Sequence, residues 1–180
     1  MNAEELREGI FSLRTRRFGT VAEIMIKKML KFEWGHTISH DLYDLTKKER
    51  IEVKFCTALK ANTKKITEGN IITEISSATN TSRMFRSNEW STYKFDCNIQ
   101  QVKKKEFEVL YYGMFFSDVV EIFKIDADSI TADIYYSDKQ HAGNEGEGQF
   151  HLNNQTYAFH KENYFVEALT YNNLLFILSN

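Results

Sequence analysis

The order of apolar and polar residues predicts one amphipathic helix followed by a series of strands. Residues 20–33, TVAEIMIKKMLKFE, place apolar side chains at helical spacing. Thr20 stands where an N-cap residue is expected, and Glu23 occupies the third helical position, as in a capping box. Gly35 is of a residue type that commonly ends helices. We therefore expect a helix that begins at Thr20 and ends near Gly35.

Strand-like patterns follow this helix along most of the chain. Apolar alternation and short apolar runs between polar turns predict strands at 37–45, 50–57, 93–101, 107–116, 119–125, 150–152 and 156–160. The intervening patterns predict a short helix with loops over 60–90, a helix over 126–136, a Gly-rich polar loop over 138–149 and a C-terminal helix over 164–178. Helices around a central mixed β-sheet indicate the α/β (α+β) class, and the length fits a single domain over residues 1–180.

Composition excludes several classes of protein. No apolar run approaches the ~20 residues that a membrane-spanning helix needs, so we expect no membrane partner. The N-terminus lacks the basic-then-apolar order of a secretory signal. Two cysteines, Cys56 and Cys97, give no disulfide framework. These features predict a cytoplasmic protein.

Charge is distributed unevenly along the chain. The net charge of −2 argues against a general nucleic-acid binder. However, residues 1–105 carry 20 Lys/Arg and 13 Asp/Glu, whereas residues 106–180 carry 3 and 12. A basic N-terminal part can follow phosphates even on a slightly acidic protein, although an unevenly charged solvated surface is the alternative.

The segment DLYDLTKKERIEVKFC, residues 41–56, reads as two strands joined by the turn TKKE. Side chains alternate between the faces of a strand, so Glu52 and Lys54 share one face, and Val53 and Phe55 share the other. Asp44, on the preceding strand, can join Glu52 if the register permits. Two carboxylates and one ammonium would then lie side by side.

This group has the chemistry of a magnesium site. Two carboxylates repel each other unless a cation lies between them, and Mg²⁺ prefers oxygen ligands while keeping several waters. Asp44 and Glu52 are the candidate ligands, and the Lys54 ammonium would orient or help deprotonate an attacking water. Such a site suits attack on a phosphodiester. The alternative is a surface ion pair.

The same residues resemble a known motif. Asp44 followed by Glu52-Val53-Lys54 resembles the PD-(D/E)XK nuclease motif in the form IEVK, although no proline adjoins the aspartate and Asp41 is a second candidate for it. Similarity to type II restriction endonucleases of this superfamily extends beyond the motif. The similar segments are 13–29, 95–125 and 137–152.

The resemblance implies a restriction-endonuclease-like core and a Mg²⁺-dependent, sequence-specific endonuclease that cuts double-stranded DNA. Glu23 matches a helix glutamate that approaches the metal site in such enzymes. Many of them are homodimers, because a two-fold symmetric protein matches a palindromic site. A repair or mobile-element nuclease with the same core, or a non-catalytic nucleic-acid-binding module, is the alternative function.

Basic and amide side chains elsewhere are candidates for DNA contacts. Arginine pairs with phosphate oxygens, and glutamine and asparagine pair with base edges, adenine in particular. The candidates come from the segment before the predicted helix, from the polar segment 76–90 and from the Gly-rich loop. They are Arg14, Arg16, Arg17, Arg83, Arg86, Gln140, His141 and Asn144. Solvated turns and loops are the alternative interpretation of these segments.

Overall fold

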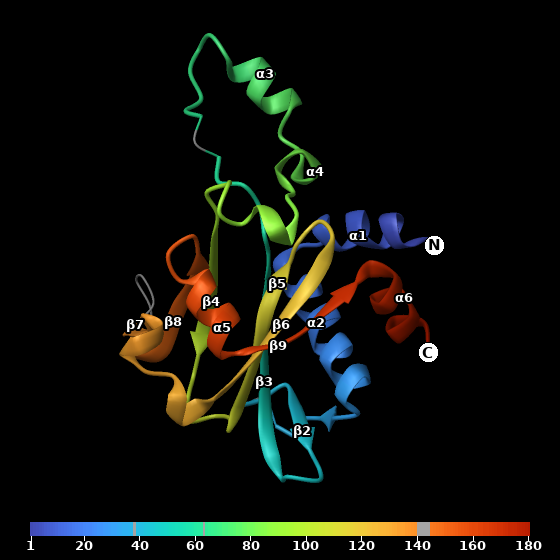
Figure 1. The fold of residues 1–180 in the computed structure, drawn as a ribbon, viewed down its shortest axis with the longest axis vertical. Helices are drawn as coiled ribbons and strands as arrows, with labels where there is room; N and C mark the ends of the chain where they lie inside the picture. Colours follow the sequence, from blue (N-terminus) through green and yellow to red (C-terminus); the bar gives the residue numbers. More distant parts are fainter. Residues whose placement is uncertain (38, 63, 140–144) are drawn as a thin grey trace.

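A mixed β-sheet lies at the centre of the fold (Figure 1). The computed structural model describes residues 1–37, 39–62, 64–139 and 145–180. The strands of this sheet, in spatial order, are β1 (Glu33–Trp34), β2 (Leu42–Asp44), β3 (Glu49–Thr57), β5 (Val109–Phe115), β6 (Val119–Asp126) and β9 (Phe165–Thr170). β3 and β5 are parallel, and the other neighbouring pairs are antiparallel.

A second, antiparallel sheet packs against one face of the central sheet. Its strands, in spatial order, are β4 (Asp96–Val102), β8 (Glu145–Asn153) and β7 (Ser137–Lys139). The helices are α1 (Ala3–Phe11), α2 (Thr15–Leu30), α3 (Ile71–Ser76), α4 (Asn80–Arg83), α5 (Tyr157–Asn163) and α6 (Tyr171–Ser179), with short 3₁₀ turns at Ser87–Glu89, Ala127–Ser129 and Ala132–Ile134. Figure 1 shows α1, α2 and α6 on one side of the central sheet, and β4, β8, β7 and α5 on the other.

The central sheet therefore has a hydrophobic core on each face. On the helical side, the buried Met25 and Ile26 of α2 pack with Ile51 and Val53 of β3. On the other side, Tyr112 and its neighbours pack against the inward residues of β4 and β8. Every residue of β5 is buried, which explains why its sequence is a continuous apolar run instead of an alternating one.

The predicted first helix is longer than expected. α2 begins at Thr15, and the Thr20 hydroxyl donates to the carbonyl of Arg16 within the helix. The prediction of Thr20 as N-cap was therefore wrong. Phe18 is buried four residues before Ala22, so the apolar stripe extends one turn further toward the N-terminus than the sequence pattern indicated.

The strand assignments for β3, β4, β5 and β6 are confirmed, whereas several later assignments were wrong. The predicted strand 156–160 lies mostly in α5, and the predicted helix 126–136 contains two short 3₁₀ turns. The predicted C-terminal helix 164–178 divides into β9 and α6, because β9 pairs with β6 along the sheet. Tertiary pairing overrides local preference at β9. The broad expectation of a mixed sheet flanked by helices is confirmed.

The predicted Gly-rich loop 138–149 is in part strand, because β7 and β8 extend into it and pair with each other. Cys56 and Cys97 are free thiols. Within the described residues, no helix is both long enough and apolar enough to cross a lipid bilayer.

Gly113, at the centre of β5, generates a stability prediction. A Cβ at this position would lie 2.0 Å from the backbone oxygen of Glu121 and 2.6 Å from a ring carbon of Phe55. Because the backbone of a central strand cannot yield, we expect Gly113→Ala to lower the free energy of unfolding by about 3 kcal/mol or more, measured by urea denaturation.

Gly9, inside α1, is the matched control. A Cβ there meets no atom within 4 Å, so Gly9→Ala should raise the free energy of unfolding by about 0.5–1 kcal/mol through helix propensity. Equal stability of Gly113→Ala and the parent protein would contradict the packing described for β5.

Candidate active site

The register of β2 against β3 decides which aspartate faces Glu52. The two strands are antiparallel, with Asp44 opposite Glu49. Directly opposite residues share a face and successive residues alternate, so Asp44 lies on the other face of the sheet from Glu52. Asp41 immediately precedes β2, and its backbone N–H donates to the carbonyl of Ile51 at 3.1 Å. Its carboxylate lies close enough to Glu52 to act on the pKa of that group.

The Asp44 side chain belongs to the hairpin turn. Its Oδ1 accepts hydrogen bonds from the backbone N–H groups of Thr46 at 2.8 Å and Lys47 at 3.1 Å. An aspartate that caps its own turn in this way is common at the first position of a turn. The structure thus places the preferred sequence candidate, Asp44, in the turn and brings the second candidate, Asp41, to Glu52.

The Asp41 carboxylate is fixed against the edge of β3. Its Oδ2 accepts the backbone N–H of Val53 at 2.9 Å. β2 begins only at Leu42, which pairs with Ile51, so strand pairing does not reach Val53 on this side. The side chain of Asp41 supplies the acceptor that a longer β2 would have provided, and the carboxylate is held beside Glu52 as a result.

Glu52 and Lys54 form an ion pair on the same face of β3. The Lys54 Nζ contacts the Glu52 Oε1. Glu52 is buried, with 9% of its surface exposed, and the Lys54 side chain is 25% exposed. A partly buried pair of this kind is held in place by its surroundings, unlike a pair on a solvated strand.

Four titratable groups influence one another at this position. The pKa of Glu52 is raised to about 7, with burial as the largest cause; Lys54 acts to lower this pKa, and the Asp41 carboxylate acts to raise it. Burial and then Asp41 raise the pKa of Glu23, on α2, and Lys54 again lowers it. Burial alone would lower the pKa of Lys54, but the surrounding carboxylates of Glu52, Asp41 and Glu23 raise it overall. Shifts with these causes are typical of functional sites.

A cavity of about 210 Å³ opens over the ion pair. The second sheet supplies part of its wall through residues that the sequence pattern did not single out as site residues. The lining residues are Ser39, Asp41, Glu52, Lys54, Gln101, Lys103, Glu106 and Glu147. Lys103 lies in the run Lys103–Lys105, which reads as a solvated turn, and Gln101 carries no sequence signal for this position.

The donor set fits a magnesium ion that keeps part of its water shell. Among the described residues, no group of three or more His, Cys, Asp or Glu side chains is arranged to hold a metal ion. Asp41 and Glu52 nevertheless offer two carboxylates at one cavity, and Mg²⁺ is usually bound through one or two carboxylates together with waters and substrate phosphates. A cation there would also relieve the repulsion between the two acids.

The arginines predicted to contact DNA have different surroundings. Arg14, Arg16 and Arg17 are exposed around the start of α2, and their side chains form no ion pair with the part of the chain that the structure describes. Arg83 donates from Nε to the carbonyl of Lys60 at 3.0 Å, so it helps to hold its own segment. None of these five arginines, Arg86 included, lines the cavity over Glu52.

Arg86 is exposed, and its Nε lies 3.8 Å from the Asp118 carboxylate. Gln140, His141 and Asn144 lie outside the described residues.

No protein family model, curated protein or solved structure matches this chain. Its function is therefore inferred from its residues and from the geometry of the site.

The raised pKa of Glu52 generates a prediction about stability. Its pKa is about 7 in the folded protein, against 4.5 for an unperturbed glutamate, so the folded state binds this proton more tightly. The stability from this group is complete below pH 4.5 and is lost as the pH rises through 7. Without added metal, we expect Glu52→Gln to flatten this fall in the free energy of unfolding.

Urea denaturation across this pH range measures the effect. Glu162→Gln, at an exposed position on α5, is the control and should leave the profile of the parent protein unchanged. Parallel profiles for the parent and Glu52→Gln would contradict the burial described for the Glu52 carboxyl.

Proposed function

We propose that this protein is a Mg²⁺-dependent endonuclease that cuts double-stranded DNA and has a restriction-endonuclease-like core. The observation that carries the proposal is the meeting of Asp41, Glu52 and Lys54 at one cavity. The resemblance to the PD-(D/E)XK motif implies one acid before the second strand of the hairpin, and an acid and a lysine two residues apart on that strand. Asp41, Glu52 and Lys54 have this arrangement.

The surroundings of the motif support the proposal. β3, which carries Glu52 and Lys54, is a central strand that pairs with β2 on one side and in parallel with β5 on the other. The Glu23 carboxyl from α2 belongs to the same electrostatic group. The exposed arginines around the start of α2 provide positive charge for phosphates.

Asp41 and Glu52 would hold the magnesium ion. When bound, the ion supplies positive charge against the phosphate and lowers the pKa of water. Glu52 must lose its proton before it can act as a ligand, and a pKa of about 7 places that step near neutral pH. The Asp41 carboxylate needs no rearrangement, because the Val53 N–H already fixes it.

Lys54 acts as a hydrogen-bond donor in this proposal. The neighbouring carboxylates raise its pKa, so it stays protonated at neutral pH. The ammonium can then orient the attacking water and stabilise negative charge that develops on the phosphate in the transition state. Glu23 would support the position of the ammonium. A homodimer would match the symmetry of a palindromic site, and this expectation stays a prediction.

Loss of Glu52 or Lys54 should abolish cleavage. We expect Glu52→Gln and Lys54→Met to lower the rate of plasmid cleavage in Mg²⁺ by about 100-fold or more, because each removes a group that acts on the reacting phosphate. EDTA should abolish plasmid cleavage by the parent protein. Lys47→Met, at an exposed turn position, is the control and should cut at the parent rate.

Cleavage by Glu52→Gln at the parent rate would falsify the catalytic assignment. Sequencing of the product ends separates the two nuclease functions. One fixed short site favours a restriction enzyme, and scattered ends favour a repair or mobile-element nuclease.

The two aspartates of the hairpin provide a matched comparison. We expect Asp41→Asn to reduce cleavage by about 100-fold or more, because it removes a proposed metal ligand. Asp44→Asn should keep the activity and lower the free energy of unfolding by at most about 1 kcal/mol, because only the turn is affected. The reverse order of activities, measured on the same plasmid, would contradict the register of β2.

A further inference from the structure

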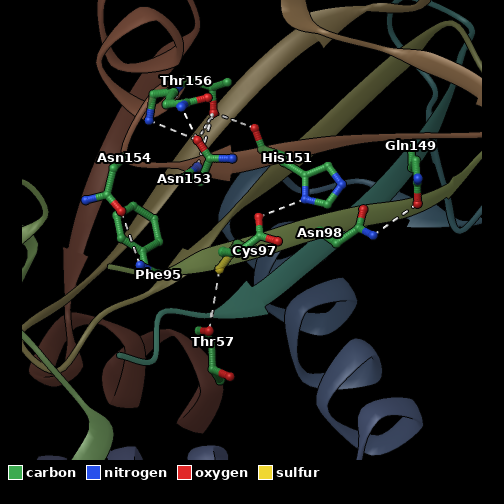
Figure 2. Close-up of polar contacts among 11 residues, drawn as sticks. Thr57, Phe95, Cys97, Asn98, Gln149, His151, Asn153, Asn154 and Thr156 are labelled. Carbon is green, nitrogen blue, oxygen red and sulfur yellow. Dashed lines mark hydrogen bonds and ion pairs between the residues drawn. The ribbon is translucent and has the colours of Figure 1, made fainter. Parts of the chain in front are cut away.

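The outward face of the second sheet carries a row of amide and imidazole side chains. In the antiparallel pairing of β4 and β8, Asn98 lies opposite His151. Cys97 and Leu152 are the next pair and are buried, so alternation turns Asn98 and His151 outward. Gln149 is on the same face of β8, two residues from His151. Figure 2 shows Asn98, Gln149 and His151 close together across the two strands.

Hydrogen bonds orient these side chains while leaving polar atoms available. Asn98 donates from Nδ2 to Gln149 Oε1 at 3.0 Å, and His151 Nδ1 donates to Asp96 Oδ1 at 2.7 Å. The amide nitrogen of Gln149 and the Nε2 of His151 form no hydrogen bond with a residue that the structure describes. Because one end of each side chain is fixed, the other end is pre-organised to meet a ligand.

The row leads directly from the candidate active site. Glu147, which lines the cavity with Glu52 and Lys54, precedes Gln149 by two residues and shares its face of β8. Lys103, from the loop after β4, forms an ion pair with Glu147 at 3.4 Å. A ligand that is seated in the cavity and extends along β8 would therefore pass over Gln149 next.

A bulge in β4 marks the junction between the cavity and the row. The register of β4 against β8 shifts between Ile99 and Val102, and Gln101 has a φ of 56°, in the left-handed region. Bulges redirect side chains and are common beside active sites. Here Gln101 lines the cavity, whereas Asn98, on the regular part of the strand, belongs to the row.

The dimensions of the row match a DNA groove. Same-face residues of a strand are ~7 Å apart, so Gln149 to His151 spans ~7 Å, or about two base-pair steps. The base edges in the major groove present donors and acceptors, and amide and imidazole groups are suited to that pattern.

We infer that the outward face of β4 and β8 contacts base edges in the major groove, with Gln149 and His151 as specificity-determining residues. The inference rests on the proposed function, because it assumes that a DNA phosphate occupies the cavity. The Gln149 amide nitrogen donates to an acceptor such as guanine O6 or a purine N7. The His151 Nε2, with the proton of the ring held at Nδ1 by Asp96, accepts from an exocyclic amino group of adenine or cytosine.

Selection from a randomised duplex library tests this inference without requiring cleavage. The Glu52→Gln protein serves as the starting protein, because it should bind DNA without cutting it. Gln149→Ala and His151→Ala are compared in this background, and Asn172→Ala, which removes an exposed amide on α6, is the control. Binding to random-sequence duplex at low salt, together with the urea midpoint, shows whether each variant is folded.

We expect the starting protein and Asn172→Ala to select the same short consensus. Gln149→Ala and His151→Ala should each lose preference at one or two positions, with affinity for the consensus reduced roughly 5- to 150-fold and binding to random duplex unchanged. Selection of the full consensus by both variants at unchanged affinity would overturn the inference.

The outcomes separate this inference from the proposed function. If the starting protein selects no consensus, the inference about Gln149 and His151 is overturned. The nuclease proposal would still stand if the parent protein cuts plasmid in Mg²⁺ and leaves scattered ends. If the consensus depends on Gln149 and His151 but the parent protein never cuts DNA, the base-reading face stands and the hydrolytic function falls.

Discussion

The hydrogen bond from the Val53 N–H to the Asp41 carboxylate is the interaction on which the site depends. It exists because β2 is short and stops pairing at Leu42, which leaves the edge of β3 open. An acid held in that gap lies next to Glu52 and must share its surroundings. The length of β2 therefore determines where the second carboxylate of the site is placed.

Holding these charges together has an energetic cost that the fold offsets only in part. Glu52 is buried beside a like charge, and Lys54 supplies the nearest compensating cation. The carboxyl of Glu23 adds a third acid from the helical side. A site in which carboxylates outnumber ammonium groups is more stable with a further cation. This is the physical link between the observed electrostatics and a metal-dependent reaction. The wall supplied by the second sheet brings the candidate base-reading row to the same place.

Strand periodicity identified part of this site from the sequence. Glu52 and Lys54 are two apart in an apolar strand, so alternation alone places them together. The first acid was harder to assign, because the length of the turn sets the register that places Asp44 opposite Glu49 and leaves Asp41 just before β2. Gln149 lies in a Gly-rich segment that reads as a loop, since its pairing with β4 is formed by residues about 50 positions away. Tertiary register of this kind leaves no local signal.

The most direct test of the central claim is anomalous diffraction from crystals of the parent protein soaked in Mn²⁺, a close substitute for Mg²⁺ at carboxylate sites. We predict a peak between the carboxylates of Asp41 and Glu52, which disappears in Asp41→Asn and persists in Asp44→Asn. A peak bound by Asp44, or a soaked crystal in which the carboxylates of Asp41 and Glu52 hold no metal, would contradict this prediction.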